Sequence, residues 1–269
     1  MKYILLFLCI LSLSCKYNVA NPVGTLRDYT EGNGIIYYVS SSATAAEIEM
    51  ELRKNKHSLG KYLIKVSATN DTSNSATNIL NEIKKALTNN PSFNNVEVDI
   101  SKLEGITEIP ESAFKDVKNL GSISLSDKMT KIDEDAFSGC SSLNNIRFSS
   151  ELATIEKGAF SNCSALTLVM LSSEKLTNIG TKAFSDCSSL VSIILSESLT
   201  NICNDAFSNC TKLANVEYLG SSTNNLKDCK PFETNPQPNN LYLPNISSGV
   251  SSFLGKTWTN PNYKKHIPN

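Results

Sequence analysis

A phenylalanine recurs through the middle of this chain at nearly constant intervals of 23 or 24 residues. A period of this length is typical of a solenoid, in which each repeat supplies one structural unit and successive units stack. Apolar residues on both sides of the phenylalanine keep the same step, so every unit has the same apolar skeleton. The three columns are Phe114, Phe137, Phe160, Phe184 and Phe207; Ile109, Ile132, Ile155, Ile179 and Ile202; and Leu120, Leu143, Leu166, Leu190 and Leu213.

Each unit reads I-x-x-x-A-F-x-x-C-x-x-L-x-x-I-x-L and ends in a short polar link. This period and the L-x-x-I-x-L core indicate leucine-rich repeats, whose short strands stack into a parallel sheet over a shared core. We therefore predict an α/β fold. It is a leucine-rich repeat solenoid with a parallel concave β-sheet, an irregular helix-bearing N-terminal cap and a short C-terminal cap.

The units resemble the BspA-like (Treponema-type) leucine-rich repeats of bacterial surface proteins. The resemblance covers roughly Ile106 to Tyr218. Val117 replaces the cysteine in the first unit, and the proline that often follows the strand is present only at Pro244. Both departures lie at the edges of the pattern, so they leave the apolar skeleton of the implied fold intact.

Four cysteines occupy one fixed position of the repeat: Cys140, Cys163, Cys187 and Cys210. A thiol suits a tight inner corner, because it behaves as a small apolar group with a weak hydrogen-bond donor. Side chains stacked in one column point the same way, whereas a disulfide needs converging Cβ atoms. We therefore predict four buried structural thiols, and Val117 in the same slot supports this. A column of zinc sites is the alternative, but it lacks histidines and paired C-x-x-C spacing.

Two further cysteines lie outside this column. Cys203 follows a repeat isoleucine, and Cys229 lies near the corresponding place one turn later. In an exported protein, a disulfide between Cys203 and Cys229 would staple the last turn. The alternative is that the two thiols do not pair.

The first residues, MKYILLFLCILSLSC, have the pattern of a secretory signal. Lys2 precedes an apolar run that is too short to span a bilayer as a permanent helix. Cys15 follows this run, and the stretch resembles a bacterial lipobox, which implies a lipid on Cys15. Leu11 and Leu13 depart from that motif, so an ordinary signal peptide cut nearby is the alternative. We expect an exported protein of the bacterial cell envelope, lipid-anchored at the outer membrane surface, with no other membrane segment.

The chain divides into five predicted parts. Residues 1–15 are a signal peptide with a lipobox-like end, 16–33 a flexible tether, 34–104 an α/β N-terminal capping region, 105–220 leucine-rich repeats of 23–24 residues, and 221–269 the last irregular repeat and C-terminal cap.

The N-terminal capping region alternates strands and helices. Strands are predicted around Tyr37 and Ile64 and from Asn95, and helices from Thr44 and Ser75. Thr44 with Glu47 forms a capping-box pattern. The alternation implies parallel pairing, either in one continuous sheet with the repeats or in a separate small α/β domain. At the other end, a short helix in SGVSSFLGKTW is expected to close the solenoid over Trp258.

The strand positions between the inward ones are expected to face the concave surface. They form two columns: Glu97, Ser124, Arg147, Met170, Ile194, Glu217 and Tyr242; and Asn95, Ser122, Asn145, Leu168, Ser192 and Asn215. An apolar centre with a polar rim is typical of a protein-binding site. We predict such a site with Leu168, Met170 and Ile194 at its centre and Arg147, Glu217 and Tyr242 around it. The alternative is that β-prone residues simply fill strand positions.

The composition argues against most other functions. Charged residues make up 19% of the chain with a net charge of -1, so there is no basic face for a nucleic acid. Two histidines and the lack of any catalytic motif give no reason to expect an enzyme, a metal or a cofactor. The resemblance implies adhesion to host matrix or serum protein or to another cell, by a monomeric, non-enzymatic surface protein. The alternative is a periplasmic or envelope scaffold with no host ligand.

Overall fold

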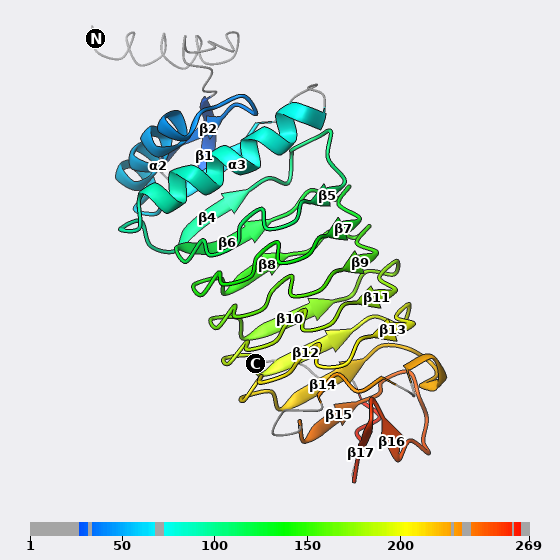
Figure 1. The fold of residues 1–269 in the computed structure, drawn as a ribbon. Helices are drawn as coiled ribbons and strands as arrows, with labels where there is room; N and C mark the ends of the chain where they lie inside the picture. Colours follow the sequence, from blue (N-terminus) through cyan, green and yellow to red (C-terminus); the bar gives the residue numbers. More distant parts are fainter. Residues whose placement is uncertain are drawn as a thin grey trace, which may run out of the picture.

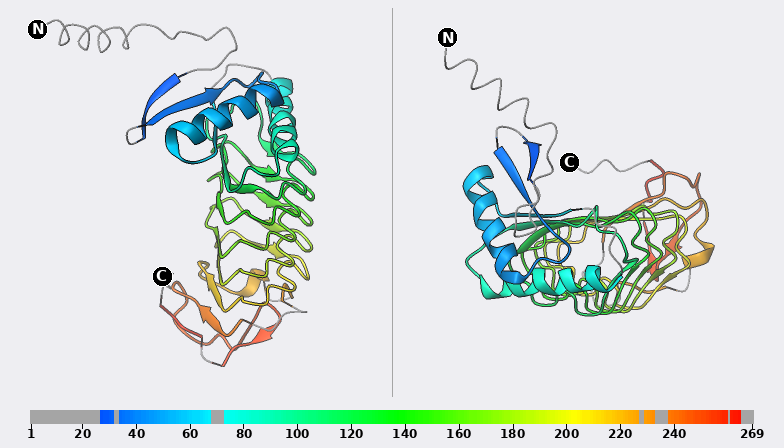
Figure 2. Two further views of the ribbon diagram at one scale, coloured as in Figure 1. Left: turned by 90° about the vertical axis from the view of Figure 1, so that its left-hand side faces the viewer. Right: turned by 90° about the horizontal axis from the view of Figure 1, so that it is seen from above.

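The computed structural model describes residues 27–31, 34–67, 73–226, 229–232, 238–259 and 261–264. The chain forms a solenoid of stacked turns, with two helices at the N-terminal end and a small hairpin at the other (Figure 1 and Figure 2). This arrangement confirms the predicted leucine-rich repeat solenoid with a helix-bearing N-terminal part. The predicted signal segment and Cys15 lie outside the described residues.

The N-terminal region adds strands directly to the repeat sheet. Its elements are β1 (Arg27–Glu31), β2 (Gly34–Val39), α2 (Ala45–Leu59), β3 (Leu63–Val66), α3 (Ser73–Asn89) and β4 (Val96–Asp99). Strands β2, β3 and β4 are parallel neighbours, and β4 pairs with the first long repeat strand, β6 (Leu120–Ser124). One sheet therefore joins this region to the repeats, as the first of the two predicted alternatives required.

For the N-terminal region, the structure confirms one predicted detail and differs from another. The capping box of α2 is confirmed: the Thr44 backbone N–H donates to Glu47 Oε2 at 2.8 Å, and the Glu47 N–H donates to Thr44 Oγ1. Strand β1 pairs antiparallel with β2. The segment predicted as a tether over residues 16–33 therefore contains a strand in its described part.

Each repeat contributes two strands, which belong to two different rows. The long strands after β6 are β8 (Asn145–Arg147), β10 (Leu168–Leu171), β12 (Ser192–Leu195), β14 (Asn215–Tyr218) and β15 (Asn240–Tyr242). The short second row consists of β5 (Glu108–Ile109), β7 (Lys131–Ile132), β9 (Thr154–Ile155), β11 (Asn178–Ile179) and β13 (Asn201–Ile202). All neighbours within the second row are parallel and in register. The apolar columns of the sequence fill the space between the two rows.

Two backbone positions in each turn have positive φ angles, and they explain why many polar residues recur at fixed places in the repeat. The first lies two residues before each phenylalanine and the second lies two residues after it, with φ between 54° and 77°. Gly, Asn and Asp tolerate this left-handed conformation better than other residues. The occupants are Ser112, Asp135, Gly158, Lys182 and Asp205 at the first position, and Asp116, Gly139, Asn162, Asp186 and Asn209 at the second.

Lys182 is the one long side chain among these ten residues, and its φ is 57°. A left-handed backbone conformation costs an L-residue roughly 1–2 kcal/mol, and glycine does not have this strain. Glycine also increases the entropy of the unfolded chain, which offsets part of the gain. Replacing Lys182 by glycine is therefore expected to raise the free energy of unfolding by about 0.5–1 kcal/mol. Urea denaturation measures this change. The control Lys212→Gly, at a position without positive φ, should lower stability, and equal losses in both variants would contradict the explanation.

The phenylalanines stack along the solenoid axis. Successive rings from Phe114 to Phe207 are nearly parallel, with centroids 5.0–5.3 Å apart, and Phe232 extends the stack by one tilted ring. All six rings are buried. The stack therefore couples each unit to its neighbours on both sides.

The repeat cysteines make a specific bond to the preceding turn. Cys140 Sγ donates to the carbonyl oxygen of Phe114 at 3.0 Å. Cys163, Cys187 and Cys210 make the same bond to Phe137, Phe160 and Phe184, and all four thiols are buried and unpaired with one another. The first unit has Val117 in this slot, and no repeat phenylalanine precedes that unit. Cysteine thus serves as an apolar side chain that also satisfies a buried oxygen.

Burial raises the pKa of the Cys140 thiol from an ordinary 9.0 to about 12, and it raises the pKa of Cys163 and Cys187 well above 9.0. Unfolding exposes these thiols, which then ionise near pH 9, so the unfolded state binds fewer protons above that pH. Their contribution to stability is complete below pH 9 and is lost as pH rises toward about 12. Urea unfolding across this window should show the decline. Cys140→Val should show a shallower decline, and identical pH profiles would contradict the assignment.

The C-terminal end is closed by a hairpin and not by the predicted helix. Strands β16 (Ser252–Phe253) and β17 (Lys256–Thr257) are antiparallel and joined by Leu254 and Gly255. Both linking residues have positive φ, 55° and 71°, as a two-residue type I′ turn requires. Trp258 is buried beneath this hairpin, and its indole N–H donates to the Phe253 carbonyl oxygen at 2.9 Å.

Candidate functional site

The row of long strands is interrupted between β8 and β10. Strands β1 to β8 of this row form a six-stranded sheet, and β10, β12, β14 and β15 form a separate four-stranded sheet. No ladder of hydrogen bonds joins β8 to β10. The concave layer, predicted as one sheet, therefore consists of two parts with an opening between them, here called the β8–β10 gap.

The solenoid itself continues past this gap. In the second row, β9 pairs with β7 on one side and with β11 on the other. The ring of Phe160 stacks on Phe137 and Phe184 at 5.1 and 5.0 Å. The opening is therefore a local feature of the concave face, and the units remain stacked behind it.

Phe148 is the sequence feature that distinguishes the edge of the gap. It occupies the slot that leucine fills at Leu125, Leu171 and Leu195, and those three leucines are buried. Phe148 and its neighbour Ile146 are only half-buried, and the Phe148 ring meets Phe160 edge-on at 5.8 Å. The same slot of the last unit holds Tyr218, which is buried, and β14 pairs with both of its neighbours. An aromatic ring in this slot is therefore compatible with pairing, and Phe148 differs in being only half-buried at the edge of the gap.

The facing edges of β8 and β10 carry backbone N–H and C=O groups that form no hydrogen bond across the gap. In a parallel ladder alternate residues direct both N–H and C=O to the same neighbour. Arg147 bonds toward β6, because its carbonyl oxygen accepts the Leu125 N–H at 3.1 Å, so Ile146 directs its groups toward β10. The Thr167 carbonyl oxygen accepts the Val191 N–H at 2.8 Å, so by alternation Val169 also bonds toward β12, and Leu168 and Met170 direct their groups toward β8. No hydrogen bond joins β8 to β10 across these fully described segments.

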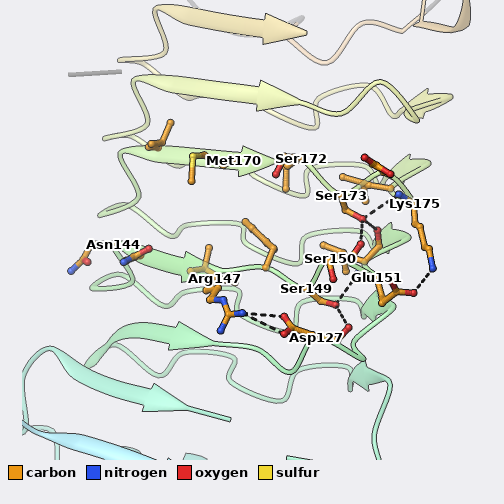
Figure 3. A pocket seen from close by; sticks show the side chains of 18 of the residues that line it. Asp127, Asn144, Arg147, Ser149, Ser150, Glu151, Met170, Ser172, Ser173 and Lys175 are labelled. Atoms are coloured by element: carbon orange, nitrogen blue, oxygen red, sulfur yellow. Dashed lines mark hydrogen bonds and ion pairs between the residues drawn. The ribbon is translucent and has the colours of Figure 1, made fainter. Parts of the chain in front are cut away.

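The gap opens into a groove of about 790 Å³ on the concave side. Figure 3 shows Arg147 on one side and Met170 on the other, with the loops after β8 and β10 at one end. Arg147 forms an ion pair with Asp127 at 3.2 Å, and Lys175 pairs with Glu151. Ser149 Oγ donates to the Asp127 carbonyl oxygen at 2.9 Å. The groove is therefore lined by both apolar and polar side chains, and two of its ion pairs are formed within the chain.

Most of the predicted binding residues lie around this groove or next to it. Met170 is 54% exposed, the highest value among the exposed large apolar residues of the described chain. Arg147 is exposed, whereas Leu168, Ile194 and Tyr242 are half-buried. The register places Met170 beside Ile194, Ile194 beside Glu217, and Glu217 beside Tyr242. Sequence reasoning missed Ile146 and Phe148, which it assigned to the core.

Two details of the predicted face are wrong. Glu217 does not lie on an exposed rim, because it is only 1% exposed. At this end of the sheet the chain also continues the row beyond the repeats, because Asn262 forms a parallel bridge with Tyr242 of β15. The first residues of both columns are also shifted by two positions: Asp99 pairs with Ser124 and Glu97 with Ser122, after an irregularity at Val96.

The remaining cysteines lie at the C-terminal end of the second row. The Ile202 backbone N–H donates to Cys229 Sγ at 3.3 Å, and Asn201 Nδ2 contacts Cys203 Sγ at 3.5 Å. Cys203 and Cys229 are not joined by a disulfide. Within the described ranges, no group of three or more His, Cys, Asp or Glu residues is placed to hold a metal ion.

The helices in the described part of the chain are too short or too polar to cross a membrane.

Comparison with known proteins identifies the repeats. Residues 107–233 match the model of the BspA type leucine rich repeat region in six copies. The search of curated proteins gives no match. Among solved structures, the chain is similar to the T. pallidum leucine rich repeat protein, with 27% identity and a TM-score of 0.46 over 54% of this chain and 71% of that one.

Two other solved structures are similar over a smaller part of their own length. A leucine rich cell surface protein from Faecalibacterium prausnitzii has 33% identity and a TM-score of 0.45, over 48% of this chain and 33% of that chain. The pneumococcal vaccine antigen PcpA has 20% identity and a TM-score of 0.48, over 58% of this chain and 37% of that chain. This chain thus spans well under half of both proteins.

Proposed function

Residues 107–233 of this chain are BspA type leucine-rich repeats, and from this premise we propose that it is a non-enzymatic, adhesin-like surface protein that binds a protein ligand on its concave face. The ligand class is a host matrix or serum protein, or a protein on another cell. Export and a lipid on Cys15 would place the repeats outside the membrane. Repeat proteins commonly present such extended surfaces to partners.

The exposure of Met170 is the observation that carries this proposal. A large apolar side chain that is 54% exposed gains little within the monomer. It lies at the mouth of the β8–β10 gap, beside half-buried Leu168 and Ile194 and close to exposed Arg147. An apolar centre with a polar border is the usual build of a protein contact site, and methionine adapts readily to different partners.

A binding panel tests the proposal. Residues 16–269 are applied to immobilised extracellular matrix and serum proteins, and saturable binding to at least one is expected. The variant Leu168→Asp, Met170→Asp, Ile194→Asp should lose it while keeping its circular dichroism spectrum. A matched variant, Thr154→Asp, Asn178→Asp, Asn201→Asp, places the same charges on the second row and should bind normally.

The results separate the proposed site from the proposed role. Equal binding by the two triple variants would remove the concave face from the proposal and keep the adhesin. An absence of binding across the panel would contradict the host ligand and favour the envelope scaffold. Protease treatment of intact cells distinguishes these two locations, because a surface protein must be cut and a periplasmic one spared.

A further inference from the structure

We propose that the β8–β10 gap receives one extended segment of the protein ligand as an inserted β-strand, which joins the two concave sheets into one. This inference rests on the proposed function and names how the ligand is held. Two features of the gap support it: its unpaired backbone edges and its side chains.

Insertion requires β8 and β10 to move apart. One strand between them would need them about 9.6 Å apart, twice the spacing of paired strands. Ser164 Oγ donates to the Ser141 carbonyl oxygen and Ser173 Oγ to the Ser150 carbonyl oxygen, so these two bonds at the ends of the gap must lengthen or break. The second row and the phenylalanine stack hold the units together behind the gap.

The two edges offer complementary rows of hydrogen-bonding groups. Ile146 on β8 and Leu168 and Met170 on β10 direct their N–H and C=O groups into the gap, and no group of the described chain bonds to them there. Such unpaired edges are templates for an added strand. In recognition by strand addition, these main-chain bonds supply affinity, while alternate side chains supply specificity.

The side chains around the gap specify the pattern of the segment. On the core side, half-buried Ile146 and Phe148 contact the apolar interior and would contact every second residue of the inserted strand. On the concave side, Met170 and Arg147 flank the alternate residues (Figure 3). Arg147 is already paired with Asp127, so no strong charge is required of the ligand. The expected segment is extended, with apolar residues alternating with polar ones.

A random library of displayed linear peptides, about eight residues long, supplies the probe for the test. Selection on residues 16–269 should yield peptides with the alternating pattern. In the complex, amide hydrogen exchange of Ile146, Phe148, Leu168 and Met170 should slow, because these N–H groups become bonded. Met170→Pro removes one such N–H without breaking a bond of the free chain, and it should weaken peptide binding roughly tenfold more than Met170→Ala does.

Several results would overturn the inference. Selected peptides that leave these amides unprotected, or that bind Met170→Pro and Met170→Ala equally, bind elsewhere or through side chains alone. If a protein of the panel binds but no linear peptide does, the result contradicts strand insertion and leaves the proposed function supported. If neither a protein nor a peptide binds, the result contradicts both proposals. Amides that are protected in the free protein at all concentrations would show that the chain itself fills the gap. Amides that are protected only at high protein concentration would show that a second copy fills it.

Discussion

Replacing Phe160 by alanine is expected to lower the free energy of unfolding by about 3–5 kcal/mol. Phe160 is fully buried, stacks between Phe137 and Phe184, and meets the ring of Phe148 edge-on. Its removal leaves a cavity and breaks three ring contacts, each worth about 0.5–1.5 kcal/mol beyond area burial. Because a repeat protein depends on contacts between adjacent units, a cavity in the third unit also weakens coupling of the two halves.

Denaturation by urea, followed by circular dichroism, measures this loss. Phe160→Leu fills most of the space and should cost clearly less, about 1–2 kcal/mol. A second, early transition in Phe160→Ala would show that the two halves unfold separately. A loss of less than about 1 kcal/mol would contradict the role of the phenylalanine stack as the principal link between units.

Replacing Phe148 by leucine is expected to close the β8–β10 gap. The equivalent slot holds a buried leucine at Leu125, Leu171 and Leu195 and a buried tyrosine at Tyr218, whereas Phe148 is only half-buried. With the larger ring gone, β8 can approach β10 and form the missing ladder. Bonds within the chain would then occupy the groups that the ligand is proposed to use, so ligand binding should fall about tenfold or more.

The binding panel and amide exchange check this prediction together. In Phe148→Leu the amides of Leu168 and Met170 should exchange more slowly than in the parent chain. Phe148→Tyr keeps the ring and places its hydroxyl at a half-buried position, so it should leave the gap and the binding unchanged. If Phe148→Leu binds as well as the parent, either another feature holds the strands apart or the gap is not the binding site.

The solenoid was predictable because its determinants repeat. The three apolar columns occur five times and the pattern around the cysteine four times, so every strand position could be assigned from its neighbours. The left-handed positions can be recognised in the same way once the structure locates them, since most of them hold Gly, Asn or Asp. The bond from each cysteine thiol to a carbonyl oxygen could not be predicted from the sequence.

The binding face was only partly predictable, because its decisive features occur once. The row of long strands breaks between β8 and β10, although the apolar residues of these units follow the same pattern as in the other units. Glu217 is buried, although its place in the repeat pattern predicted an exposed side chain. Leu254 and Gly255 form the turn of the terminal hairpin, and leucine stands there in place of the Asn or Asp that is usual in such a turn.

Amide hydrogen exchange of the unliganded chain tests the central claim most directly. The gap predicts fast exchange at Leu168 and Met170, whose N–H groups face the opening. It predicts slow exchange at Ser192 and Ile194, which pair with β10 in the adjacent ladder. Equal, slow exchange at all four amides would show that β8 and β10 are paired, and would contradict both the gap and the ligand-binding mode built on it.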